Sequence, residues 1–282
     1  MRLAVLFAAL FAVSASAQDD RRPPLFVLSD GDSRVYLLGS VHVLPDGALP
    51  LPDHVEAAYA EASVVAFEVD LDASKGAAAA MMAAAADEAL LPDLLTAAQR
   101  DTVHARVGAL GMPGTAFDGY EPWFAAANYG LVALQSAGLP VMDGGVDLHF
   151  YDRAGADGKE RLGLETAEAQ FAAFDGASDE AQVAYLMASV SADPVTDFAD
   201  LVAMWEAGDD AGLAALGPRS LGHPEMIERA LTARDRAWVP QIEALLARDG
   251  ETALVVVGAL HLVGDGGVVA MLREAGHTVE RL

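Results

Sequence analysis

The chain has 282 residues, 53 % of them hydrophobic, so it can bury a full core in one large domain or two small ones. Its 42 acidic residues against 17 basic ones give a net charge of −25, which argues against nucleic acid as a partner. The absence of cysteine excludes thiol nucleophiles, thiolate metal sites and disulfides. The carboxylates are scattered along the chain, so we interpret the charge as a solubility feature rather than an acidic binding tail.

The first 17 residues, "MRLAVLFAALFAVSASA", have the pattern of a secretory signal peptide. Arg2 gives a positive start, an apolar run follows, and small residues end at Ala17, where we expect cleavage. The alternative, a membrane anchor, requires roughly 20 apolar residues and the run is shorter. We therefore expect a periplasmic or secreted protein of residues 18–282, with no stable membrane insertion once the signal is removed.

The rest of the chain alternates strand-like and helical patterns, which predicts an α/β fold with a mixed, largely parallel sheet. A large helical section occupies the middle, and we expect a single domain with a helical insertion around residues 72–138. The predicted strands cover residues 24–28, 35–39, 63–71, 139–143, 160–165, 253–258 and 278–282.

Two stretches far apart in the sequence repeat one pattern. "LLGSVHVLPDG" (37–47) and "VVGALHLVGDG" (256–266) each place Gly-x-x-His at the end of an apolar strand and an Asp-Gly pair four residues after the histidine. Both are followed by a predicted helix and another strand, so we interpret them as an internal duplication. Ligands in open α/β sheets usually bind at the carboxyl ends of strands, which is where both histidines fall.

His42 and His261 are the histidines of these two motifs, and neutral imidazole is the commonest metal ligand in proteins. Gly39 and Gly258 precede them and, having no side chain, leave room for a ligand beside each ring. A single Gly-x-x-His is weak evidence, because a lone histidine is more often structural. The extended match between the two stretches is what favours a functional interpretation.

Three acidic residues occupy positions where a carboxylate calls for an explanation. Glu68 lies in the apolar strand "SVVAFEVDL", where a buried carboxylate is costly unless it is paired, protonated or bound to metal. The alternative is an edge strand with Glu68 in solvent, but so apolar a strand favours a central position. Glu165 ends another strand before Thr166, a candidate helix cap, and Asp147 in "GGVD" fits a helix start as well as a functional role.

Several segments together resemble the TraB/GumN family, which includes the Tiki proteases and the pheromone-shutdown proteins. They are "LLGSVHVLPDG", "FEVD", "GGVD", "GLETAEAQ", "TARDRAWVPQIEALL" and the last 28 residues, and they follow the family's order over nearly the whole mature chain. The resemblance implies an α/β fold with two Gly-x-x-His motifs and an essential glutamate, and in the Tiki branch divalent-metal-dependent proteolysis. By position it implicates His42, Glu68 and His261, with Asp147, Glu165 and Arg234 in support.

We therefore expect an exported metal-dependent hydrolase that acts on peptides or proteins. His42, Glu68 and His261 would hold the metal and leave one position open for water. Glu165 would accept a proton from that water, while Arg234 orients this carboxylate or stabilises an oxyanion. Mixed histidine and carboxylate ligands suit Mn²⁺, Co²⁺ or Zn²⁺.

A second hypothesis is a non-catalytic protein that binds or sequesters peptides on the same scaffold. It depends on one departure from the family, which often has Arg-Asn on its long helix where this chain has Arg234 followed by Asp235. Clustered metal ligands favour the enzyme, and turnover distinguishes the two hypotheses.

Overall fold

The structure is a computed structural model, and it describes residues 19–282 except residues 46, 75, 87–89 and 142–143. The predicted signal peptide, residues 1–17, lies outside the described residues.

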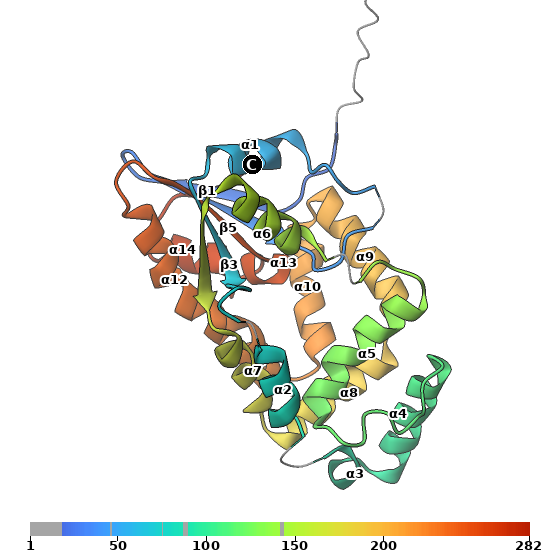
Figure 1. The fold of residues 1–282 in the computed structure, drawn as a ribbon. Helices are drawn as coiled ribbons and strands as arrows, with labels where there is room; N and C mark the ends of the chain where they lie inside the picture. Colours follow the sequence, from blue (N-terminus) through green and yellow to red (C-terminus); the bar gives the residue numbers. More distant parts are fainter. Residues whose placement is uncertain (1–18, 46, 75, 87–89, 142–143) are drawn as a thin grey trace, which may run out of the picture.

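A six-stranded mixed sheet forms the centre of the protein (Figure 1), with the order β4-β3-β5-β2-β1-β6. The four strands from β4 to β2 are mutually parallel, and β1 runs antiparallel to both of its neighbours. The strands are β1 (Leu25–Ser29), β2 (Arg34–Ser40), β3 (Val64–Val69), β4 (Glu160–Glu165), β5 (Thr252–Gly258) and β6 (Val279–Arg281).

The predicted α/β class with a largely parallel sheet is confirmed, and so is the central position of the strand that carries Glu68. That strand, β3, lies between β4 and β5. The predicted strand over residues 139–143 is wrong where the structure describes it, because residues 139–141 are a half-buried link between helices. Gly138, at φ +84°, turns the chain there and Pro140 lacks the N–H that a strand ladder needs.

Helices cover both faces of the sheet (Figure 1), with α1 and α6 on one face and α12 and α14 on the other. The helices are α1 (Asp53–Glu61), α2 (Ala77–Ala84), α3 (Leu91–Leu94), α4 (Ala97–Ala109), α5 (Pro122–Ser136), α6 (Val146–Asp157), α7 (Ala167–Asp175), α8 (Asp179–Ser191), α9 (Pro194–Ala207), α10 (Asp210–Leu221), α11 (Pro224–Ile227), the π-helix η1 (Glu228–Thr232), α12 (Ala233–Leu246), α13 (Ala259–Leu262) and α14 (Val268–Glu274).

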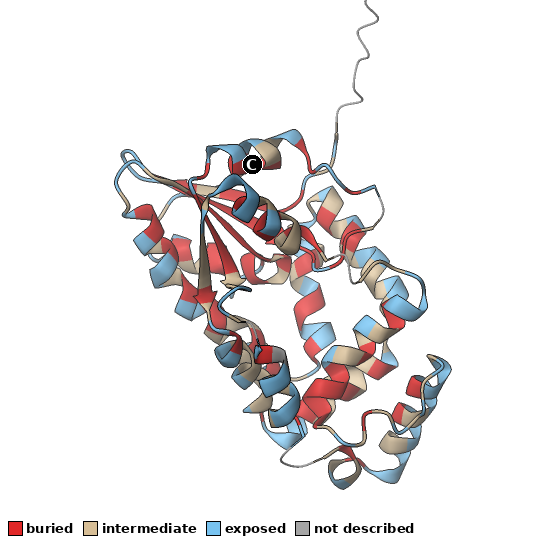
Figure 2. Ribbon diagram, in the orientation of Figure 1, coloured by how far each residue is buried: buried red, intermediate tan, exposed pale blue. Residues whose placement is uncertain are grey.

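The main core lies between the sheet and these two helical layers. Strands β2, β3 and β5 are buried over most of their length (Figure 2), as expected for parallel strands covered on both faces. Alternate residues of β3 serve opposite faces: Phe67 packs edge-on against Tyr151 of α6, whereas Glu68 reaches Arg234 of α12. Glu68 therefore lies on the α12 face of the sheet, near the end of β3.

The helical middle of the chain extends away from the sheet and contains a second hydrophobic cluster. This cluster is built from α3, α4, α5 and α8, with Leu91, Val107, Tyr129 and Leu186 among its buried members. It lies apart from the main core and has apolar packing of its own. Within the described part of the chain, no helix is both long and apolar enough to cross a membrane.

The two Gly-x-x-His segments occupy related places in the fold. The first connects β2 to α1 and β3, and the second connects β5 to α14 and β6, so each has the predicted order of strand, histidine, helix and strand. They differ locally, because His42 lies in an irregular turn while His261 lies in the one-turn helix α13. Since β2 and β5 are parallel neighbours, the two histidines emerge at the same edge of the sheet.

Candidate functional site

The carboxyl ends of the four parallel strands bring together the residues that the sequence singled out. β2 leads into His42, β3 carries Glu68, β4 ends at Glu165, and β5 leads into His261. Gly258 marks the point of convergence. A Cβ atom at Gly258 would lie 3.2 Å from Oε1 of Glu68, 3.5 Å from Cδ2 of His261 and 3.8 Å from Nε2 of His42. Glycine here keeps that space free of a side chain, as predicted.

Glu68 is the most heavily hydrogen-bonded carboxylate of the site. Its Oε1 accepts a bond from the backbone N–H of Gly258 at 2.7 Å, and its Oε2 accepts bonds from Arg234 at 2.7 Å and from Gln170 at 3.0 Å. Burial alone would raise the pKa of Glu68, but His261, Arg234 and His42, with the Gly258 N–H, lower it to about 2. Glu68 is therefore an anion at neutral pH although it is nearly buried.

Arg234 joins the two glutamates of the site. Its Nε and Nη2 donate to Oε1 of Glu165 at 2.9 and 2.5 Å, while Nη2 also bonds Glu68 and Nη1 bonds the backbone carbonyl of Ala230. The side chains of Arg234, Glu68 and Glu165 are only 9 %, 12 % and 10 % exposed. Without Arg234, the two carboxylates would be nearly buried at the ends of the strands with no guanidinium to pair with them.

The π-helix η1 immediately precedes α12 and ends at Thr232, two residues before Arg234. Single π turns inside helices occur often at functional sites, because the extra residue shifts the side chains that follow. The turn also supplies the Ala230 carbonyl that receives a bond from Arg234. The irregular helix therefore helps to hold Arg234 toward the strand ends.

His261 is held from both sides of its ring. Its Nδ1 lies 2.6 Å from Oδ1 of Asp235, which is 1 % exposed, and its ring packs 4.6 Å from the ring of Trp238. Its Nε2 lies 3.2 Å from Nη1 of Arg234. Because a guanidinium only donates, Nε2 must accept this bond, so the Nδ1–H is directed to Asp235. Asp235 thus fixes the tautomer with an unprotonated Nε2.

His42 has the same kind of partner in a more open setting. Its Nδ1 lies 3.2 Å from Oδ2 of Asp147 on α6, and its side chain is 64 % exposed. The Asp147 carboxylate raises the pKa of His42 to about 9. Asp147, a candidate on sequence grounds, therefore lies in contact with the first histidine, and Nε2 of His42 faces the space beside Gly258.

Gly145 explains how α6 comes so close to the turn that carries His42. A Cβ at this position would lie 1.9 Å from the carbonyl oxygen of Val41 and 2.6 Å from Cα of His42. The next N–H, of Val146, donates to the same Val41 carbonyl at 3.0 Å. Gly39, in contrast, leaves no space for a ligand, because Ala259 and Pro24 lie 3.0 Å from its missing Cβ. The ligand space expected beside Gly39 is therefore absent, whereas a side chain at Gly258 would meet Glu68 and the two histidines.

Gly145→Ala should separate Asp147 from His42. The new methyl group would meet backbone atoms of Val41 and His42, which cannot move aside as a flexible side chain can. We expect a loss of about 1–3 kcal/mol in the free energy of unfolding, typical of overpacking. The His42 ring signals in the NMR spectrum should shift at the same time. Gly130→Ala on α5 is the matched control, because a Cβ there meets nothing within 4 Å. Equal unfolding energies and an unchanged His42 spectrum in both variants would contradict the close-approach argument.

A model of the TraB/PrgY/gumN family matches residues 24–281, nearly the whole chain. The chain belongs to the TraB/PrgY/gumN family. Comparison with curated proteins and with solved structures finds no significant match.

The donor atoms suit a divalent cation in their chemistry, although their spacing is not that of a formed centre. Among residues 19–282, outside the gaps given above, no three histidine or acidic side chains stand together at metal-binding distances. Each imidazole nevertheless has a carboxylate at Nδ1, the arrangement in which metal-ligating histidines are usually held. To bind a cation, Nε2 of His261 would have to give up its bond from Arg234, and His42, whose pKa is raised to about 9, would have to release a proton. Two Nε2 atoms with Glu68 therefore fit Mn²⁺, Co²⁺ or Zn²⁺.

The sequence pointed to most of the side chains that meet here, but not to the roles of Asp235, Gly145 and Gln170. Asp235 entered only as a departure from the family pattern, yet it is the partner of His261. Gln170 is three residues beyond Ala167, the start of α7, which Thr166 caps through a bond from the Ala169 N–H, as predicted. A Gly-Gly pair before a helix was the available signal for Gly145.

Proposed function

We propose that this TraB-family protein is an exported metal-dependent hydrolase that cleaves peptides or proteins. The observation that carries the proposal is the matched pair of histidine and aspartate contacts. Asp147 holds Nδ1 of His42 and Asp235 holds Nδ1 of His261, while Glu68 lies between the two rings beside Gly258. Structural histidines have no general need for this shared orientation, whereas metal-ligating histidines do.

In this proposal His42, Glu68 and His261 hold the ion. A divalent cation, when bound, polarises a peptide carbonyl and lowers the pKa of water, which makes a nucleophile available at neutral pH. Asp147 and Asp235 keep the two imidazoles in the ligating tautomer. Export would follow from the predicted signal peptide, with cleavage after Ala17.

In the same proposal Glu165 accepts a proton and Arg234 stabilises negative charge. Both bonds from Arg234 to Glu165 reach Oε1, so we assign the proton from the attacking water to Oε2. Arg234 orients the carboxylate by these two bonds, and its positive charge favours the negative charge that develops on the substrate carbonyl oxygen. The cation–π contact with Trp238, at 4.9 Å, adds to the hold on Arg234.

Glu165→Gln tests the general-base assignment. The amide retains an oxygen for Arg234 but cannot accept a proton, so we expect the variant to keep its metal and lose about 10²- to 10⁴-fold in kcat. Glu160→Gln, at the other end of β4 where Glu160 pairs with Arg248 on the surface, is the matched control and should keep full activity. Retained turnover in Glu165→Gln, measured on a cleaved peptide, removes Glu165 from the mechanism.

One observation favours the second hypothesis, that the protein binds or sequesters peptides without cleaving them. Arg234 is already ion-paired with both Glu68 and Glu165, so the cluster is stabilised by the chain's own cation. This hypothesis predicts that peptides bind equally well before and after chelation and are never cleaved.

A further inference from the structure

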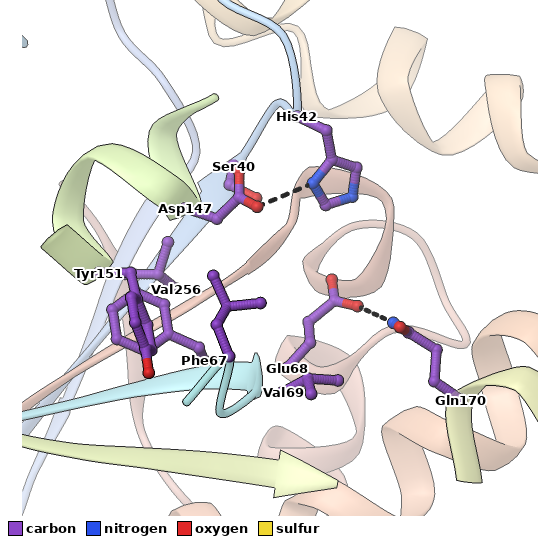
Figure 3. Close-up of a pocket in the computed structure, with 10 residues that line it drawn as sticks. Ser40, His42, Phe67, Glu68, Val69, Asp147, Tyr151, Gln170 and Val256 are labelled. Carbon is purple, nitrogen blue, oxygen red and sulfur yellow. Dashed lines mark hydrogen bonds and ion pairs between the residues drawn. The ribbon is translucent and has the colours of Figure 1, made fainter. Parts of the chain in front are cut away.

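A cavity of about 130 Å³ opens beside His42 and Glu68 at the carboxyl edge of the sheet (Figure 3). The ends of β2, β3 and β5 and the first turns of α6 form its walls, and Gln170 of α7 contributes to its rim. The two candidate ligand residues occupy one side of it. A group bound in this cavity would therefore lie directly next to the proposed reacting centre.

The remaining walls are mainly apolar. Phe67, Val69 and Val256 contribute hydrophobic side chains, and Tyr151 contributes its ring. The hydroxyl of Tyr151 is already engaged, because it donates to Asp70 at 2.6 Å and accepts a bond from the Asp72 N–H at 2.8 Å. Tyr151 therefore presents an apolar surface to the cavity.

Leu71 lines the same cavity and is 46 % exposed, one of the few large apolar side chains in the described residues with that much exposure. An exposed leucine next to an apolar cavity lowers the free energy if a bound apolar group covers both.

Two of the residues that line the cavity, Ser40 and Asp147, each carry a buried polar atom with no hydrogen-bond partner among the described residues: Oγ of Ser40 and Oδ1 of Asp147. Ser40 is only 3 % exposed. Buried polar atoms are costly when unpaired, so the chain leaves two polar groups unsatisfied next to the cavity.

We propose that this cavity is a substrate side-chain pocket that receives one aliphatic or aromatic residue of a peptide beside His42 and Glu68. The inference rests on the proposed function only in taking a peptide as the ligand. An engineered apolar cavity of about 150 Å³ holds benzene, so a leucine or phenylalanine side chain matches the available space and an indole exceeds it. A glycine residue leaves the pocket empty and gains nothing from its apolar walls.

Methyl NMR of the purified wild-type protein tests the pocket without any need for turnover. The probes are N-acetyl-leucinamide and N-acetyl-glycinamide, each titrated into metal-free protein. The leucine probe should shift the methyl signals of Val69, Leu71 and Val256 and bind roughly tenfold to a hundredfold more tightly than the glycine probe, the effect of burying one leucine side chain.

Leu71→Asp places a charge at the opening and should weaken binding of the leucine probe about tenfold or more. Leu131→Asp, which replaces a leucine of similar exposure on α5, is the matched control and should bind like the wild type. Equal shifts with both probes, or no shift of the methyl signals of Val69, Leu71 and Val256, would overturn the pocket. This binding test uses neither metal nor cleavage, so a failure of the metal-loaded protein to cleave peptides would refute the hydrolase and leave the pocket intact.

Discussion

His42→Ala should abolish metal retention and peptide cleavage while leaving the free energy of unfolding nearly unchanged. The side chain is largely exposed, so its removal takes little packing from the core, and solvent can replace it as the partner of Asp147. Removal of a residue that only holds a metal ligand in place lowers metal affinity about 10- to 100-fold. We therefore expect removal of a direct ligand to lower metal affinity at least about 100-fold. Metal titration calorimetry and urea unfolding measure the two quantities separately.

The control for this variant is His104→Ala. His104 lies away from the strand ends, and its Nε2 is 2.8 Å from Oδ1 of Asp118. The control variant should keep both metal and activity. His261→Ala is a less clean test than it looks from the sequence, because it would leave the buried Asp235 carboxylate without its partner and destabilise the fold. Metal binding by His42→Ala at wild-type affinity would remove His42 from the ligand set.

Arg234→Met should be the most destabilising single change in the site. It leaves Glu68 and Glu165, both nearly buried, without their common cation, and breaking a buried ion pair in this way costs about 3–5 kcal/mol. Arg236→Met, two residues along the same helix, removes an exposed pair with Glu228 at 3.1 Å and should cost at most about 1 kcal/mol. Urea unfolding at neutral pH compares the two variants directly.

Arg234→Met should also change the pH dependence of stability. In the wild type the pKa of Glu68 is lowered from 4.5 to about 2, so its stabilising contribution is present above pH 4.5 and is lost as the pH falls toward 2. Without Arg234, one of the groups that lower that pKa is lost while burial still raises it, so the pKa of Glu68 should rise and the loss of stability relative to the wild type should shrink as acid protonates the glutamates. A loss of stability that stays constant from pH 7 down to about pH 3 would contradict the ion-pair account.

The parallel part of the sheet could be predicted from the sequence because β2, β3 and β5 are apolar runs. A Gly-x-x-His motif or a glutamate lies at or near the end of each run. Glu68 stood out for the same reason, as a charge inside such a run. The predicted strand at 139–143, wrong over the described residues 139–141, shows the limit of this reasoning, since a short apolar run between two helices has the same composition. Periodicity reports which residues are buried and says little about which segments pair.

The partners of the two histidines were much harder to foresee. Asp235 reaches His261 because a π-helix and a long helix aim both Arg234 and Asp235 at the strand ends, and no local pattern encodes that direction. Asp147 reaches His42 because Gly145 lets two backbones approach each other, a contact between residues about 100 positions apart. Such contacts depend on tertiary packing, which a single sequence does not display.

The family's usual asparagine, replaced here by Asp235, can be interpreted in the same physical terms. Either side chain offers an oxygen that can accept the Nδ1–H of His261, so the substitution preserves the tautomer with an unprotonated Nε2. Burial raises the pKa of the Asp235 carboxyl, and the bond from His261 opposes that rise. The departure from the family pattern is therefore compatible with the proposed ligand set.

The central claim is that His42, Glu68 and His261 form a metal site that cleaves peptides. The most direct measurement is the metal content of the purified protein together with cleavage of a broad peptide library, before chelation, after chelation and after return of Mn²⁺, Co²⁺ or Zn²⁺. We predict a bound divalent ion, cleavage that chelation abolishes, and recovery when the metal is restored. Two results together would contradict the claim: the protein loaded with each metal cleaves no peptide, and it binds peptides equally well after chelation.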